Sequence, residues 1–424
     1  MFWYGFLLPL GFAGVDSRGR QRIIGHLGKF NQTDMKTRIN NLFAIFTILS
    51  FLVLNLREIH AGDAPTYRGK VVLIVDKTIA ADPDVGSKIE RLINDLTGDG
   101  WRVLRHDVDR GPELNSPFVL SGTTALDWAQ KTAPRVREVR ALIQADYNAA
   151  PTEVKNVFLI GHVATPYSGL NAMVSGGHYR GAQPADAFYG DMTSSYSPRG
   201  WSDTNTDLSA VDYAPWLPEV LNRPADGKFD EDYMPSPMKL GVGRLDFCGI
   251  IGMGLNETTM ISRYLDKDHA FRCANFLVHR KAILAGWADG PFCINGSPAV
   301  TSAFGSGNVL SICADGNNWF PNVRTNSYLL GYGGGYGGGS GAMGIGSTDD
   351  VPGSDLVNNF RLLDSQVVFV TLSGSWFGDW DEEGEDFLKA PLANPYDPAN
   401  GRYGYGLTVT WGFLGLDRNG ETTL

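Results

Sequence analysis

The sequence predicts an α/β protein made of two related subdomains, each with a mostly parallel sheet flanked by helices. Short apolar runs rich in β-branched residues recur along the chain, for example at residues 71–75 and 367–370. Segments whose apolar residues return every three or four positions lie between such runs. Strands that alternate with helices in this way form parallel sheets with helices on both faces.

The composition indicates a folded chain that binds neither nucleic acid nor an anionic membrane. Its 424 residues are 43% hydrophobic and 19% charged, enough to bury a large core in two or three packed units. The formal net charge is -10, and the Lys and Arg residues form no cluster. Nucleic acids and anionic membranes attract clustered Lys and Arg, so cations or neutral ligands are the expected partners.

The first subdomain is expected at residues 70–275. Its strands are recognised as apolar, β-branched runs and its helices by their helical spacing of apolar residues. Asp82 can cap the first helix and Gly98 can end it. In chain order we expect strands at 71–76, 101–108, 157–162 and 238–246, and helices around 85–96, 136–143 and 260–265.

A segment without periodicity, residues 166–237, interrupts this subdomain. It is rich in Gly, Pro, Asp, Tyr and Trp. A loop of this length is usually functional or forms a lobe of its own. The second subdomain is expected at residues 276–424, with a C-terminal region possible beyond Leu424. Its expected strands lie at 281–287, 328–330 and 367–372.

The N-terminal part of the sequence predicts export. A basic start at residues 35–38 is followed by an apolar run at 42–54 and by Ile59-His60-Ala61 as a cleavage site, so we assign residues 35–61 to a signal peptide. Residues 1–34 place apolar residues before basic ones, which indicates a mis-assigned extension. An uncleaved signal anchor is the alternative. Both interpretations put the folded part in a secreted, periplasmic or cell-surface location, with no membrane contact beyond the signal segment.

Four short motifs are similar to those of a known family. They are residues 157–162, Ala185-Asp186-Ala187-Phe188-Tyr189-Gly190, residues 226–230 and Gly241-Val242-Gly243-Arg244-Leu245. With them, the chain from about Lys70 onward resembles the gingipain-type cysteine peptidases, which are caspase-like α/β proteins. The resemblance implies a caspase-like fold with two related subdomains, and a cysteine-type endopeptidase that acts on a protein or peptide.

The resemblance also implies that the family's catalytic pair is replaced. In that family a strand-end Gly-His-Gly supplies the histidine, and a later strand end followed by Gly-Asp-aromatic supplies the cysteine. The matching positions here are Gly334 and Ser375. A serine without an adjacent base is a weak nucleophile, so the family's reaction is not expected from these two residues.

A second pair follows from topology. His162 ends one expected parallel strand and Cys248 lies just past another, and ligands of α/β sheets bind at carboxyl strand ends. The two could form a nucleophile and its base. The alternative is a histidine satisfied by loop backbone and a small buried thiol. His178 is a third histidine in a loop, and the four cysteines show no CxxC spacing that would indicate zinc.

An acidic cluster suggests a metal ion. Carboxylates in a Gly-rich context are the hard oxygen ligands that Ca²⁺ takes, and an extracellular setting supplies that ion. A solvated acidic loop is the alternative. The candidate ligands are Asp226, Asp230, Asp232, Asp186 and Asp191.

These observations leave two functions from different classes. One is an exported gingipain-like member of the cysteine-peptidase family in which Gly334 and Ser375 replace the catalytic dyad, so that peptidase activity is not expected from the family's positions. The other is a non-catalytic extracellular binding or surface-structural protein that uses the acidic and aromatic loops. A glycoside hydrolase built on Asp379, Asp381 and the nearby tryptophans is a weaker hypothesis, since adjacent carboxylates do not show the separation that such a pair needs.

Overall fold

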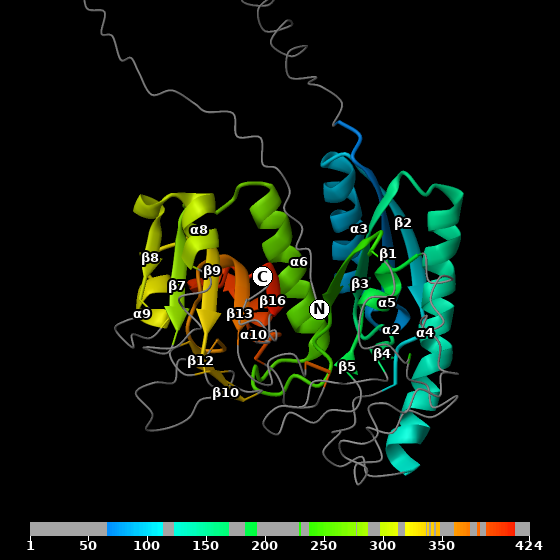
Figure 1. The fold of residues 1–424 in the computed structure, drawn as a ribbon. Coiled ribbons are helices and arrows are strands. Elements are labelled where there is room, and N and C mark those ends of the chain that lie inside the picture. The colour runs from blue at the N-terminus through cyan, green and yellow to red at the C-terminus, as the bar shows by residue number, and fades with distance from the viewer. Residues whose placement is uncertain are drawn as a thin grey trace, which may run out of the picture. The chain divides into compact units, whose positions relative to one another are not determined.

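The two larger sheets of the structure, which is a computed structural model, are built from parallel strands (Figure 1). The first has the strand order β2-β1-β3-β6 and the second the order β16-β13-β9-β7-β8. Helices pack against both, which confirms the predicted α/β class with mostly parallel sheets.

The structure describes a large part of the chain from residue 66 onward. The predicted extension and signal peptide lie outside the described residues. From Arg68 on, the chain belongs to one unit. The described residues are 66–112, 123–168, 183–192, 229, 237–276, 278–286, 297–312, 319–335, 337–338, 341–342, 345–347, 360–373, 380–381 and 387–411.

The first sheet has β1 at its centre. Residues 71–75 of this strand are fully buried, which explains a continuous apolar run instead of an alternating one. β1 pairs with β2 from Gly69 opposite Trp101 onward, and with β3 on its other side. The strands are β1 (Gly69–Asp76), β2 (Trp101–Val108), β3 (Val154–Ile160) and β6 (Gly241–Leu245).

The helices of this half begin and end largely where the sequence indicates. Asp82 caps α3 by accepting hydrogen bonds from the N–H groups of Asp84 and Val85, both at 3.0 Å, and α3 ends at Gly98. The predicted helix at 136–143 belongs to a longer α4. The helices are α2 (Lys77–Ala80), α3 (Pro83–Gly98), α4 (Thr123–Ala149), α5 (Ala187–Gly190) and α6 (Glu257–Arg272).

The second sheet packs closely around a buried tryptophan. A Cβ on Gly331 of β9 would come within 2.4 Å of the Trp319 ring, so only glycine fits there. Its strands are β7 (Ala282–Gly286), β8 (Val309–Ser311), β9 (Tyr328–Gly334), β13 (Val367–Ser373) and β16 (Thr408–Trp411), with helices α8 (Ser297–Phe304), α9 (Trp319–Val323) and α10 (Ala390–Ala393).

Short antiparallel strands complete the described fold. They are β4 (Tyr167–Ser168) with β5 (Gln183–Pro184), β10 (Gly337–Gly338) with β11 (Gly341–Ala342) and β12 (Gly346–Ser347), and β14 (Tyr396–Asp397) with β15 (Arg402–Tyr403). Within the described part of the chain, no helix combines the length and apolar character needed to cross a bilayer.

The two halves share a core along α3 and α6. One apolar cluster contains Leu73 of β1, Ile261 of α6 and Val368 of β13. Across the contact between α3 and α6, Lys88 and Arg91 both pair with Asp266, at 2.9 and 2.7 Å. These ion pairs anchor α6 on α3, and the shared apolar cluster joins the second sheet to the first half.

Candidate functional site

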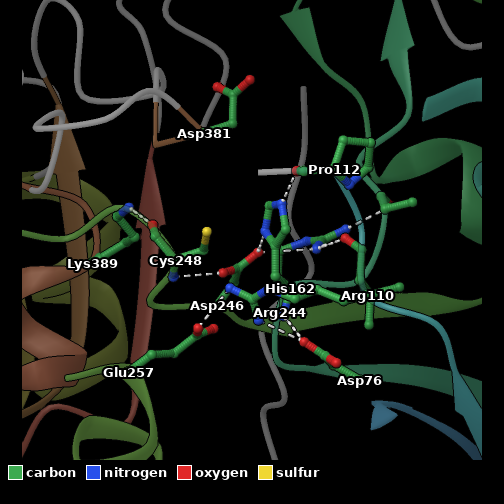
Figure 2. Close-up of polar contacts among 12 residues, drawn as sticks. Asp76, Arg110, Pro112, His162, Arg244, Asp246, Cys248, Glu257, Asp381 and Lys389 are labelled. Atoms are coloured by element: carbon green, nitrogen blue, oxygen red, sulfur yellow. Dashed lines mark hydrogen bonds and ion pairs between the residues drawn. The ribbon is translucent and has the colours of Figure 1, made fainter. Parts of the chain in front are cut away.

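Polar side chains gather at the carboxyl edge of the first sheet (Figure 2). Asp76 is the last residue of β1, Arg110 follows β2, His162 follows β3, and Asp246 and Cys248 follow β6. Because the four strands are parallel, their carboxyl ends lie at one edge, and the side chains that follow them meet there.

His162 lies between two hydrogen-bond acceptors. Its Nδ1 is 2.9 Å from Asp246 Oδ2, and its Nε2 is 2.6 Å from the Pro112 carbonyl oxygen. A carboxylate and a carbonyl both accept, so both ring nitrogens carry a proton and the ring is an imidazolium. Burial lowers the pKa of His162, but the charge of Asp246 and hydrogen bonding with Asp246 and Cys248 outweigh burial and hold the pKa well above its usual value.

Asp246 connects the imidazole with the cysteine. Its Oδ1 accepts the backbone N–H of Cys248 at 2.9 Å, while its Oδ2 accepts from His162 and lies 3.4 Å from the guanidinium of Arg244. Burial raises the pKa of Asp246, but the charges of His162, Arg244 and Lys389 and the His162 hydrogen bond lower it to about 2. The buried carboxylate is therefore ionised, and Cys248 is buried beside it.

The segment that follows β2 packs against the loop that carries His162. Arg110 donates to Asp76 and to Glu257, each at 2.7 Å. The next residue, Gly111, donates its N–H to the His162 carbonyl at 2.7 Å, and a Cβ at Gly111 would lie 3.1 Å from that carbonyl oxygen. This packing fixes the Pro112 carbonyl on the imidazole.

Arg244, in one of the motifs that carry the family resemblance, binds a second motif and the loop that follows a third. It donates twice to Asp186, at 2.8 Å for each bond, and also to the Val163 carbonyl at 2.5 Å. The pair is almost completely buried, with side chains 3% and 6% exposed. Burial lowers the pKa of Arg244, but Asp186 raises it more, so the guanidinium stays charged. Arg244 thus holds the 185–190 motif and the loop after β3 against β6.

The second half of the chain also contributes to this site. Lys389 donates to the Cys248 carbonyl at 2.8 Å. Asp381 accepts a hydrogen bond from the hydroxyl of Tyr167. The guanidinium carbon of Arg244 lies over the ring of Trp380, 5.1 Å from the centroid of the ring. Side chains from both subdomains therefore define the site.

The structure brings His162 and Cys248 together at one edge, as strand topology predicts. Asp246 joins the two residues, because its Oδ2 accepts from His162 Nδ1 and its Oδ1 accepts the backbone N–H of Cys248, each at 2.9 Å. The alternative interpretation, a histidine satisfied by loop backbone and a small buried thiol, also has support. The Pro112 carbonyl accepts from one ring nitrogen, and Cys248 is buried. Gly334 lies at the end of β9 opposite Ser373 of β13, and Ser375 and His178 lie outside the described residues.

Most of the predicted calcium ligands lie outside the described residues. Asp226, Asp230 and Asp232 are not among the described residues. Asp186 uses both carboxylate oxygens on Arg244, and Asp191 is fully buried. In the part of the chain that the structure describes, no group of three or more His, Cys, Asp or Glu side chains could hold a metal ion. The described residues do not fit a calcium site.

Several residues of the site do not stand out in the sequence reasoning. Asp246 lies two residues before Cys248 and directly after β6, so its position at a strand end is the same signal that marks His162 and Cys248. Arg110 also follows a strand of the same sheet, and Asp76 is the last residue of another. Lys389 is different, because it is separated from Cys248 by 141 positions and follows no strand of the first sheet.

Comparison with known proteins gives one similar fold. No family model matches the chain. No curated protein matches it either. Among solved structures, the chain is similar to the crystal structure of the Arg-specific cysteine proteinase gingipain R, with a TM-score of 0.44 and 11% identity over 81% of this chain. The match spans 62% of that chain.

Proposed function

We propose that this chain is a gingipain-type cysteine peptidase with a caspase-like fold, whose reacting pair is Cys248 and His162 at the edge of the first sheet. The observation that carries the proposal is the buried Asp246 carboxylate, which accepts from His162 Nδ1 and from the backbone N–H of Cys248, each at 2.9 Å. A nucleophile, a base and a group that orients the base are the parts that covalent hydrolysis needs. Gly334 has no part in it.

The reaction can be written with these side chains. The Cys248 thiolate attacks the carbonyl carbon of a peptide, which forms a C–S bond and places the carbonyl electron pair on oxygen. When that pair returns, the C–N bond breaks and the His162 imidazolium donates its proton to the leaving amine. Water then attacks the thioester and gives its proton to the imidazole, and the thiolate leaves as the acid forms. Asp246 keeps the ring oriented throughout.

One contact must change for this chemistry. The Nε2 proton of His162 is donated to the Pro112 carbonyl at 2.6 Å. To protonate a leaving amine, the imidazolium has to exchange that carbonyl for the substrate nitrogen. The described arrangement is therefore a resting state, and substrate binding displaces the Pro112 carbonyl.

A thiol-directed peptide probe tests the proposal. A peptidyl acyloxymethyl ketone should label Cys248, and mass spectrometry of the digested protein should find the adduct there. The exposed Cys273 serves as a reference within the same chain. Labelling of Cys273 alone, in protein shown to be folded by circular dichroism, would refute the proposed pair.

The same contacts support an alternative from another class. A buried thiol and a histidine bonded to loop backbone also suit a non-catalytic binding or surface-structural protein. Such a protein would use the acidic and aromatic loops between residues 166 and 237. Absence of hydrolysis and of Cys248 labelling in folded protein would favour it.

Export is the second part of the proposal. The basic start at Met35 and the site after Ala61 support a mature protein that begins near Gly62 and is secreted, periplasmic or on the cell surface. N-terminal sequencing of exported protein tests this. Recovery of residues 1–34 on the folded protein would contradict it.

Calcium binding is proposed for Asp226, Asp230 and Asp232, because three acidic residues lie close to one another in the sequence and carboxylate oxygens are ligands that Ca²⁺ takes. Asp186 and Asp191 are left out because of their contacts in the fold. A bound ion would raise the melting temperature at millimolar Ca²⁺. The same melting curve with and without Ca²⁺, in the parent chain and in Asp230→Ala, would exclude the site.

A further inference from the structure

Lys389 reaches the Cys248 site from the second subdomain. It immediately precedes α10, and its carbonyl accepts the N–H groups of Leu392 and Ala393, both at 3.0 Å. Phe387 and Ala390 on either side are fully buried, so the backbone at this position is firmly anchored. The lysine side chain is buried as well.

The buried ammonium group has two partners at the site. Its Nζ donates to the Cys248 carbonyl at 2.8 Å. Its charge is also one of those that lower the pKa of Asp246 against the effect of burial. A buried charge is costly unless it is compensated, and Asp246, which also pairs with His162 and Arg244, contributes to that compensation. Lys389 is thus part of the electrostatic balance around Cys248 and His162 (Figure 2).

The backbone of Cys248 is held at both of its polar groups. Its N–H is donated to Asp246 at 2.9 Å and its carbonyl accepts from Lys389 at 2.8 Å. A peptide group is planar, so fixing the carbonyl fixes the whole peptide plane between Cys248 and Gly249. Gly249 has a φ of 72°, which lets the chain turn away directly afterwards. The direction of the Cys248 side chain is set by these two bonds.

We propose that Lys389 is a positioning residue for Cys248, supplied by the second subdomain, which fixes the cysteine backbone and adds positive charge that favours the thiolate. This inference rests on the proposed function, because it assigns a partner to the same thiol. A cation close to a cysteine stabilises the thiolate, the form that reacts. The reactivity of a residue in the first half therefore depends on a side chain from the second.

Alkylation of the full chain measures this directly. Iodoacetamide modifies thiolates, and peptide mass spectrometry reports the rate at Cys248 and at Cys273 separately across pH. In Lys389→Met we expect the pH midpoint for Cys248 to rise by about one unit, and its rate below that midpoint to fall about tenfold. Lys389→Arg should restore most of the rate, and the Cys273 rate should not change, since a folding defect would affect both thiols.

The outcomes separate the two proposals. An unchanged Cys248 profile in Lys389→Met, with the parent Cys248 alkylated at lower pH than Cys273, would overturn the role of Lys389 and leave the proposed function intact. A parent Cys248 that alkylates no more readily than Cys273 would overturn both. If Lys389→Met does not fold, Lys389→Gln takes its place, because the amide can still donate to the Cys248 carbonyl but lacks the charge. Equal profiles for Lys389→Gln and Lys389→Arg would then overturn the proposed charge effect.

Discussion

The two larger sheets are both parallel, so each has a carboxyl edge, but the two edges carry different side chains. At the first edge, the strand ends are followed by Asp76, His162 and Asp246, which form a hydrogen-bonded set with Cys248. At the second edge, Gly334 of β9 lies opposite Ser373 of β13. A parallel sheet therefore brings strand ends together in both halves, but the residues placed there decide which edge can carry acid–base and thiol chemistry.

The largest expected difference between the two edges is catalytic. His162→Ala should lower the hydrolysis of a mixed set of fluorogenic peptides by at least about 100-fold, because it removes the group that protonates the leaving amine. Ser375→Ala, which changes the residue two positions after β13 in the sequence, should leave the rate within a factor of two of the parent.

The converse result would reverse the comparison. If Ser375→Ala abolished hydrolysis while His162→Ala retained it, Ser375 and not the His162 site would carry the reaction. Far-ultraviolet circular dichroism of both variants confirms that the rates compare folded proteins.

The first edge also depends on a buried ion pair. Arg244→Met leaves Asp186 as an unpaired buried carboxylate, so we expect a loss of about 3 to 5 kcal/mol in the free energy of unfolding. Glu90→Gln is the matched control, because it removes the pair between Arg105 and Glu90, whose acidic side chain is 64% exposed. That control should cost less than about 1 kcal/mol. Urea unfolding measures both, and equal losses would show that Arg244 is not a structural anchor of the edge.

Much of the first edge could be predicted from the sequence, and the reason is periodicity. The apolar run at 71–75 marks a buried central strand, and parallel topology then places His162 and Cys248 at one edge. The contacts of Asp186 could not be predicted, because its partner Arg244 is 58 positions away and no pattern links the two. The same holds for Lys389 and the Pro112 carbonyl, whose positions depend on how loops pack.

A smaller effect is expected from the segment that covers His162. In Gly111→Ala the new methyl group would lie 3.1 Å from both the Ala164 Cα and the His162 carbonyl oxygen, so the segment must shift. We expect a loss of about 2 kcal/mol in stability from this overpacking. Because the shift weakens the contact of the Pro112 carbonyl with Nε2, the pKa of His162 should also fall, as a histidine NMR titration can measure. A stable variant with an unchanged titration would show that the segment adapts without releasing the ring.

The smallest effect concerns α10, the helix that directly follows Lys389. Lys267 of α6 is fully buried and donates to the carbonyls of Leu392 and Asn394 at the end of α10, at 2.8 and 3.2 Å. Burial lowers the pKa of Lys267 to about 7, below its unfolded value of 10.5.

Between these two pKa values the unfolded chain binds a proton that the native state does not bind, so the Lys267 contribution to stability must rise with pH across this window. Relative to Lys267→Met, the parent should gain about 1 kcal/mol per pH unit between pH 7.5 and 9. Taking the difference between the two proteins removes the opposite contribution of His162, whose raised pKa stabilises the fold at low pH and loses that effect as pH rises through it. Urea unfolding at the two pH values gives this difference. A parent that gains nothing over the variant would mean that Lys267 stays charged when buried, held by the carbonyls at the end of α10, and that α10 is anchored by a permanent charge at that end.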